Sequence, residues 1–291
     1  MNTVIISVLY NQKLASGNTW NTLILPALRS GRNRPVILAD NSTDTQIREE
    51  NRETAGKYGA VYLDMQGNRG LPAAYNRAVD VVLQERNEQD RGKKRAVSEK
   101  NRSEDEWIVI ADQDTCFPDS YLKMLEEAAG QTTYDVFAPV VKAGEKQLSP
   151  CCRKGSRFVP YSSERPEKKE LQEVFFINTG LAFRKTLFED PKNRYDEQLF
   201  LDFVDFDLVN RLRSRTDVRF GMLPGIVLQQ EFSGTEVRSA EQDLERFRHF
   251  VHDGRLFYER WYGRGAAESA VRMRALKLTV KHRDIRFLKN L

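Results

Sequence analysis

Short runs of β-branched and other apolar residues alternate with helix-like segments along the first half of the chain. Four runs, at 4–9, 35–39, 60–63 and 107–111, each end in polar residues and predict buried strands. Between them, apolar positions recur at helical spacing over 19–28 and from Pro72 to about Arg86. Strands that alternate with helices indicate an α/β fold, with a mostly parallel central sheet flanked by helices.

The second half of the chain has a less regular pattern. Residues 86–106 are nearly all polar or charged, and 153–172 contain two prolines and a Lys-Lys pair, so both predict solvent-exposed loops. The run 174–177 predicts a further strand. After Ser239 the apolar positions again follow helical spacing. We therefore expect one domain over 1–240 and a C-terminal helical extension over 241–291.

Composition narrows the classes of protein that fit. The net charge of +4 over 291 residues favours anionic ligands or an anionic membrane surface, but is too sparse for a nucleic-acid-binding protein. Three cysteines, two of them adjacent, do not form a disulfide framework, which indicates a reducing cytoplasm. Neither they nor the three histidines have the spacing of a zinc site. The sequence shows no secretory signal and no apolar run of about 20 residues.

The most informative polar residues follow the most apolar run. Asp112, Gln113 and Asp114 come directly after 107–111. Ligands of open α/β sheets bind at the carboxyl ends of strands. Two carboxylates one residue apart suit a divalent cation that holds a phosphate, because hard cations prefer oxygen ligands. A solvated turn before Pro118 is the alternative for this tripeptide taken alone.

Five motifs occur in a fixed order along residues 1–240. A strand runs into Tyr10-Asn11, and a second runs into the polar segment 40–44. They are followed by Asn68-x-Gly70-x-x-Ala73-x-x-Asn76, by Asp112-Gln113-Asp114, and by the acidic segment 200–207. In this order they resemble the family 2 glycosyltransferases of the GT-A fold, and among these most of all the bacterial rhamnosyltransferases.

The resemblance implies a chemistry and a set of residues. It implies an inverting transferase that moves a sugar from a nucleotide diphosphate to a saccharide or lipid-linked acceptor in bacterial surface polysaccharide synthesis. The favoured donor is dTDP-rhamnose, with UDP-galactose or UDP-glucose as alternatives. Mg²⁺ or Mn²⁺ would stabilise the leaving diphosphate, with Asp112 and Asp114 as metal ligands. The implied nucleotide-sugar-binding residues are Tyr10, Asn11, Asp40, Asn68, Gly70, Asp112 and Arg211.

The acceptor hydroxyl needs a carboxylate that takes its proton. Matching Asp207-Leu208 to the end of the family pattern makes Asp205 the general base, with Asp202 as the second candidate. On a helix, Asp202 and Asp205 would share a face, whereas Asp207 would point elsewhere and is expected to be a structural partner of an arginine. The segment Asn178-Thr179-Gly180 is implied to line the acceptor or sugar side.

Two features leave alternatives open. Family members often carry a histidine after the next strand, but 227–234 contain none, so Gln230, Glu231 or water would fill that position. Obligatory metal binding is therefore in question, and a non-catalytic nucleotide-sugar-binding protein stays an alternative. The basic segment 272–289 fits attachment to the inner face of the cell membrane. However, its charged and apolar residues mix around a helical wheel, so a solvated or oligomer-forming helix is expected equally.

Overall fold

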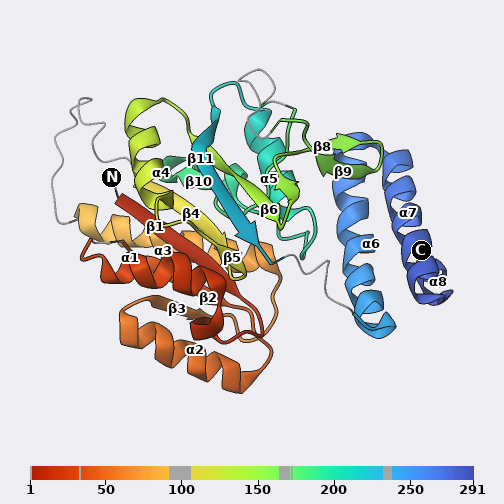
Figure 1. Cartoon of the computed structure of the whole chain (residues 1–291), viewed down its shortest axis with the longest axis horizontal. Helices are drawn as coiled ribbons and strands as arrows, with labels where there is room; N and C mark the ends of the chain where they lie inside the picture. Colours follow the sequence, from red (N-terminus) through yellow and green to blue (C-terminus); the bar gives the residue numbers. More distant parts are fainter. Residues whose placement is uncertain (1, 33, 92–105, 164–170, 172, 232–237) are drawn as a thin grey trace.

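The computed structural model describes residues 2–32, 34–91, 106–163, 171, 173–231 and 238–291. Figure 1 shows a twisted central sheet with helices on its two faces and a separate group of helices at one side. In the sheet the strands lie in the order β3-β2-β1-β4-β10-β6-β11-β5, and β7 pairs with β6. Their bounds are β1 Asn2–Leu9, β2 Val36–Asp40, β3 Val61–Asp64, β4 Glu106–Asp112, β5 Thr115–Cys116, β6 Val136–Ala143, β7 Lys146–Ser149, β10 Ala182–Arg184 and β11 Phe220–Gln230.

The first four strands of the sheet are parallel, as the alternating pattern predicts. Their register aligns the carboxyl ends, because Leu9 of β1 pairs with Asp40 and Val8 pairs with Asp112. On the other side of β2, Asp40 pairs with Asp64 of β3. The polar residues that follow these strands therefore meet along one edge of the sheet.

The second half of the sheet is mixed rather than parallel. β10 is inserted antiparallel between β4 and β6, and β5 and β7 are also antiparallel to their neighbours. Among the described strands of this half, β6 and β11 are parallel to each other. The predicted α/β class is confirmed, and the parallel pairing holds for the first four strands and for this one further pair.

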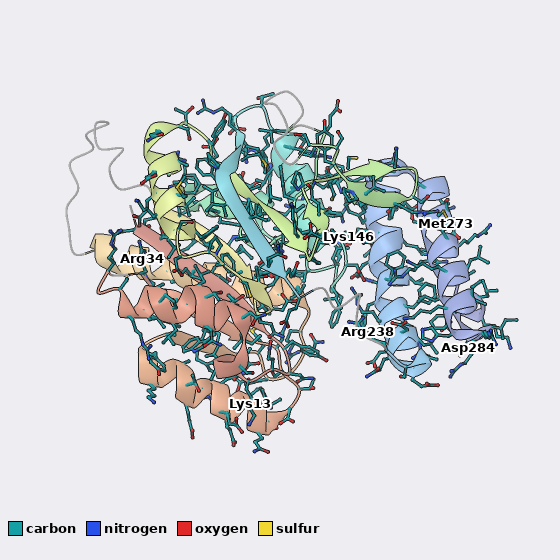
Figure 2. All side chains as sticks on the ribbon, in the orientation of Figure 1. Lys13, Arg34, Lys146, Arg238, Met273 and Asp284 are labelled. Atoms are coloured by element: carbon teal, nitrogen blue, oxygen red, sulfur yellow. The ribbon has the colours of Figure 1, made fainter. Side chains whose placement is uncertain are left out.

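Helices cover both faces of the sheet, and side chains fill the layers between them (Figure 2). One core contains residues of α3 and α5, and the core on the opposite face contains residues of α1, α2 and α4. The helical segments of this part are 3-10 turns at Leu14–Ser16, Lys185–Glu189 and Pro191–Asn193, a π-helix at Trp20–Ile24, α1 Leu25–Arg29, α2 Thr45–Tyr58, α3 Leu71–Arg91, α4 Tyr121–Gln131 and α5 Val204–Arg213.

The C-terminal helices are α6 Ala240–Tyr262, α7 Arg264–His282 and α8 Arg286–Lys289. Ser239 caps α6 with a reciprocal pair of hydrogen bonds to Gln242, which explains why the helix begins there. α6 contacts the rest of the chain through aromatic rings, including Phe257 stacked on Phe203 at 4.8 Å between ring centroids. The helical character predicted after Ser239 is confirmed, and the division of the chain at residue 240 stays a prediction.

Three local predictions are wrong or incomplete. The run 174–177 has the side-chain alternation of a strand but forms none, because among the described residues its pairing is limited to one isolated bridge, between Phe175 and Cys151. The loop predicted over 153–172 contains part of a hairpin, β8 Cys151–Lys154 with β9 Arg157–Pro160, turned at Gly155. The helix predicted to about Arg86 continues to Arg91, and the rest of that predicted loop, 92–105, lies outside the described residues.

Candidate active site

The carboxylates of the Asp112-Gln113-Asp114 motif are joined by one amide. The Gln230 side chain, at the end of β11, donates from its Nε2 to Asp112 Oδ2 and to Asp114 Oδ1, at 3.2 Å each. The other oxygen of Asp112 accepts a 3.0 Å hydrogen bond from the Tyr75 hydroxyl of α3. Burial and the Asp112 charge raise the pKa of Tyr75, so this hydroxyl stays protonated and donates.

The carboxylates of Asp112 and Asp114 lie close together at this point, because both accept a hydrogen bond from Gln230. Burial raises the pKa of Asp112, and the nearby charges of Asp114 and Asp205 raise it further. Burial raises the pKa of Asp114 as well. In the part of the chain that the structure describes, no ion pair of either aspartate with Lys, Arg or His is found. A cation bound here would compensate both carboxylates.

Asp205 reaches the same region from α5. The helix starts at Val204, after Phe203 in a left-handed conformation (φ 62°). The Asp205 carboxylate accepts hydrogen bonds from the backbone N–H of Phe206, at 2.8 Å, and from that of Asn178. Burial nevertheless raises the pKa of Asp205 to about 6. The residue is thus a stronger base than an exposed aspartate and is still ionised at neutral pH.

The segment Asn178-Thr179-Gly180 connects the two groups of carboxylates. Thr179 Oγ1 accepts a hydrogen bond from the Asp112 backbone N–H at 3.2 Å, and the Asn178 backbone N–H binds Asp205. The Asn178 side chain accepts a 3.1 Å hydrogen bond from Tyr195, whose ring stacks on that of Tyr75. The segment predicted on the acceptor side therefore lies beside both Asp112 and Asp205.

Gly180 allows this close packing. Its φ of +78° lies in the left-handed region, and a Cβ placed there would come within 2.4 Å of Leu228 and 2.7 Å of Pro139. Its carbonyl accepts a 2.8 Å hydrogen bond from Tyr121. Gly180 therefore shapes the segment through its backbone.

Tyr10 lies next to the Asp112-Gln113-Asp114 motif and exposes its ring. Its backbone N–H donates to the Gln113 side-chain oxygen at 2.8 Å, and its carbonyl accepts from the Gln113 amide at 3.1 Å. Tyr10 is 46% exposed, although large apolar or aromatic residues are usually covered. An exposed ring held at the carboxyl edge of the sheet suits packing against a nucleobase.

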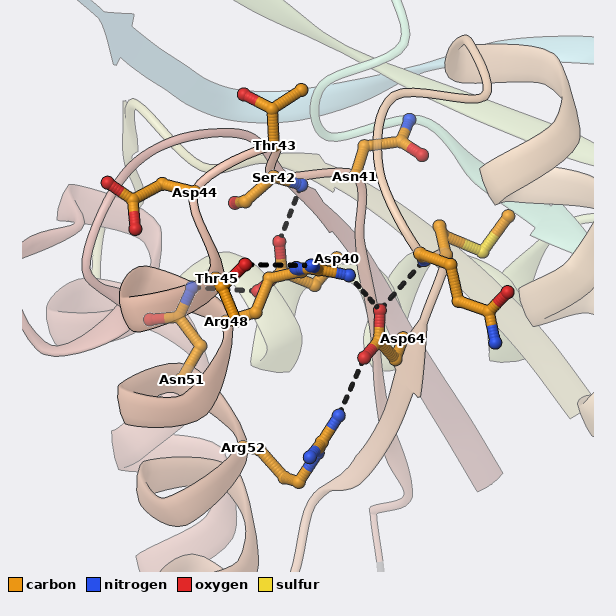
Figure 3. A network of polar contacts seen from close by, with 12 residues as sticks. Asp40, Asn41, Ser42, Thr43, Asp44, Thr45, Arg48, Asn51, Arg52 and Asp64 are labelled. Carbon is orange, nitrogen blue, oxygen red and sulfur yellow. Dashed lines mark hydrogen bonds and ion pairs between the residues drawn. The ribbon is translucent and has the colours of Figure 1, made fainter.

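Asp40 is fully buried at the centre of a polar network (Figure 3). Its Oδ1 accepts from the Ser42 backbone N–H, and its Oδ2 accepts from Asn51 and from the Tyr62 hydroxyl, all at 2.9 Å. On the outer side of the network, Asp64 pairs with two arginines, Arg48 and Arg52. These bonds fix the loop after β2, and contact of Asp40 with a nucleotide stays a prediction.

Asn11 holds the same loop from the other side. Its side-chain oxygen accepts hydrogen bonds from the backbone N–H groups of Thr43, at 2.9 Å, and Asp44, at 3.3 Å. Asn11 has a φ of 45°, a left-handed conformation that asparagine tolerates well. Its implied contact with a nucleotide sugar also stays a prediction.

Asn68 and Gly70 form a turn before α3. The Asn68 side chain accepts from the Gly70 N–H at 3.1 Å, and the Gly70 carbonyl accepts from Asn41 at 2.9 Å. At Gly70, φ is +85° and a Cβ would lie 2.9 Å from the Phe200 ring. The turn therefore brings the loop after β3 against the acidic segment 200–207.

The remaining acidic residues have structural partners. Asp202 forms a two-contact ion pair with Arg246 of α6, one contact measuring 2.7 Å. It precedes α5, so the prediction that it shares a helical face with Asp205 is wrong. Asp207 is fully buried and accepts from Arg211, Arg260 and Trp261 at 2.8 to 2.9 Å. Its predicted pairing with an arginine is confirmed.

Arg211 lies in the Asp207 cluster. Besides binding Asp207, its guanidinium donates to the carbonyls of Lys192 and Arg194. All three guanidinium nitrogens are therefore bound within the protein, and contact of Arg211 with a nucleotide sugar stays a prediction.

The sequence gives no sign that the two stacked tyrosines, Tyr75 and Tyr195, belong to this site. Tyr75 in particular occupies an ordinary apolar position of the predicted helix.

The residues present suit a hard divalent cation. Asp112 and Asp114 offer carboxylate oxygens, and the Gln230 amide would offer its Oε1 if the side chain turned over, an orientation that hydrogen bonding decides. Within the described ranges, no group of three or more His, Cys, Asp or Glu side chains surrounds one cation position. The donor set is thus two carboxylates and an amide, with further positions left to a ligand or water.

Comparisons with known proteins give a fold but no family. No model of a protein family and no curated protein matches this sequence. A crystal structure of S. aureus TarS aligns with 99% of this chain and 54% of the TarS chain, at 13% identity and a TM-score of 0.51. A structure of TarS 1-349 in complex with UDP-GlcNAc aligns with 88% and 67% of the two chains, at 14% identity and a TM-score of 0.49.

The chain thus spans about half the length of the longer TarS chain. At 13% sequence identity, the structural similarity to TarS shows a shared fold and nothing finer. The fold is the predicted GT-A arrangement, a central sheet flanked by helices with a C-terminal helical region. In the described residues, no helix is both long enough and apolar enough to cross a bilayer.

Proposed function

We propose that this protein is a glycosyltransferase that moves a sugar from a nucleotide diphosphate to a hydroxyl acceptor. The observation that carries the proposal is the convergence of Asp112, Asp114 and Asp205 on one edge of a GT-A sheet. Two of them share the Gln230 amide, and the third lies close enough for its charge to raise the pKa of Asp112. Closely spaced carboxylates with raised pKa values are typical of functional sites.

The two carboxylate groups would have different tasks. Asp112 and Asp114, with Gln230, would hold Mg²⁺ or Mn²⁺, which when bound stabilises the negative charge of a leaving diphosphate. Asp205 would take the proton of the acceptor hydroxyl, for which its pKa of about 6 is well matched. The N–H of Asn178 and the N–H of Phe206 hold its carboxylate in one orientation. Tyr10 would pack against the base of the donor.

The resemblance to rhamnosyltransferases favours dTDP-rhamnose as the donor, with UDP-linked sugars as alternatives, and a saccharide or lipid-linked acceptor of a surface polysaccharide. One base on the acceptor side supports a single in-line displacement and hence inversion at the anomeric carbon. A retaining double displacement would need a second carboxylate near that carbon. Asp202 is the candidate for that role, but its carboxylate is paired with Arg246.

The test is turnover by the whole chain with a panel of dTDP- and UDP-linked sugars, including UDP-GlcNAc, and Mg²⁺ or Mn²⁺. We expect Asp205→Asn to bind the donor with unchanged affinity and to lose at least about 10²-fold in turnover, because the amide accepts no proton. Asp202→Asn is the matched comparison. Full turnover by Asp205→Asn, or donor binding without turnover by the unaltered chain, would overturn the proposal, the second result in favour of a binding protein.

A further inference from the structure

Most of the exposed large apolar side chains among the described residues lie at the C-terminal end of the chain, on α7 and on either side of α8. Seven large apolar or aromatic side chains are exposed among the described residues, and five of them fall within 273–291. These five are Met273, Leu276, Val280, Ile285 and Leu291. Val280 is the most exposed, at 76%. A cluster of this kind, in contrast to scattered single residues, marks an interaction surface.

Helix α7 has two apolar faces. Its inner face buries Val271, Ala275 and Leu278 in the core shared with α6. Its outer face carries Met273, Leu276 and Val280, which share one side of the helix at i, i+3 and i+7. This explains why a helical wheel shows apolar residues all round. Figure 2 places Met273 on α7, the outer helix of the C-terminal group, on the far side of α6 from the sheet.

The charge of the chain is also concentrated here. Residues 264–291 contain eight Lys or Arg and two Asp or Glu, whereas the rest of the chain contains 38 and 40. Helical spacing places Arg272 on one flank of the outer apolar face and Lys277 on the other. Arg283, which ends α7 in a left-handed conformation, is exposed near its last turn. Exposed apolar residues flanked by basic residues are the pattern of a helix that lies in a membrane interface.

We propose that the outer face of α7, defined by Met273, Leu276, Val280, Arg272 and Lys277, docks on an anionic lipid surface. The apolar side chains would enter the boundary between headgroups and acyl chains, and the basic side chains would extend to the phosphates. A second copy of the chain fits this face poorly, because two strongly basic segments would then face each other.

The test is flotation of the full-length chain with vesicles of phosphatidylcholine alone and of phosphatidylcholine mixed with phosphatidylglycerol. We expect binding to the anionic vesicles only, weakened by added salt. The double variant Leu276→Ser/Val280→Ser and the double variant Arg272→Glu/Lys277→Glu should each weaken binding by at least about tenfold. The matched control, Lys57→Glu/Lys123→Glu, removes the same charge from exposed positions elsewhere and should bind within about twofold of the unaltered chain.

Thermal unfolding checks that each variant is folded, which we expect because the substituted side chains are exposed. Absence of binding to anionic vesicles would overturn the proposal. An equal loss of vesicle binding by the control Lys57→Glu/Lys123→Glu would also overturn the proposal, because it would show that binding depends on net charge alone. A dimer in sedimentation velocity that Leu276→Ser/Val280→Ser abolishes, without any vesicle binding, would assign the face to a second copy instead.

Discussion

Two aspartates on the same helix are expected to respond in opposite ways to removal of their charge. Asp205 has a pKa raised to about 6 from an ordinary value of 3.8, so its ionised form destabilises the folded chain. Asp207, two residues later, is fully buried and bound by Arg211, Arg260 and Trp261. We therefore predict that Asp205→Asn raises the free energy of unfolding and that Asp207→Asn lowers it.

The magnitudes follow from these surroundings. A pKa difference of about two corresponds to about 3 kcal/mol, and since Asn accepts the Phe206 and Asn178 N–H groups less well, we expect a gain of about 1 to 3 kcal/mol. For Asp207→Asn, loss of a buried ion-pair partner costs about 3 to 5 kcal/mol, reduced to about 2 to 4 here because both arginines remain partly exposed to water.

The effect of Asp205 on stability depends on pH. A carboxyl whose folded pKa is raised makes the unaltered chain lose stability as pH rises from about 4 to about 6. The advantage of Asp205→Asn should therefore be full above pH 6 and decline toward pH 4. Urea unfolding of both variants without divalent cations, at pH 5 and pH 8, measures this. A free energy of unfolding for Asp205→Asn no higher than that of the unaltered chain at pH 8 would contradict this prediction.

Two further predictions concern the site. Gly180→Ala should lower the free energy of unfolding by about 2 to 4 kcal/mol in the same urea assay, because the added Cβ meets Leu228 and the φ of Gly180 is positive. The control is Gly56→Ala in α2, where the added Cβ has open space. It should leave the free energy of unfolding equal or slightly higher. In calorimetry, Asp114→Asn should lose most of the Mg²⁺-dependent affinity for a nucleoside diphosphate. The control, Asp119→Asn, changes an exposed aspartate and should keep this affinity. Equal affinity of the unaltered chain with and without Mg²⁺ would contradict the assignment of Asp114 as a metal ligand.

The first half of the fold could be predicted because each strand is an apolar run that ends at polar residues in the sequence. The run 107–111 is apolar at every position, as a strand covered on both faces requires, and it ends where Asp112 begins the polar edge. The polar residues that follow the other parallel strands could be predicted to lie near Asp112, because the carboxyl ends of parallel strands lie at one edge of a sheet. The register of β1 with β2 and with β4 shows this alignment. Local pattern and global arrangement agree there.

The second half could not be predicted in the same way, because tertiary contacts decide its conformation. The run 174–177 has the composition of a strand, yet the chain passes there as a buried loop. Ala182–Arg184 is a shorter and less β-branched run, but it becomes β10 because it pairs with both β4 and β6. Propensity is a weak guide when two neighbouring strands offer hydrogen bonds to one segment.

The insertion of β10 also explains why the site residues could be named from the sequence while their connection could not. The Gly180 N–H binds the Ile110 carbonyl, and the Ile110 N–H binds the Leu181 carbonyl. This pairing places the residues just before β10 along the end of β4, where Thr179 receives the Asp112 N–H. Because Asn178 is one residue further back, its N–H reaches Asp205. The segment before the antiparallel strand β10 thus links Asp112, at the end of β4, to Asp205 of α5, a helix that begins more than 90 residues later. No local sequence pattern indicates this contact.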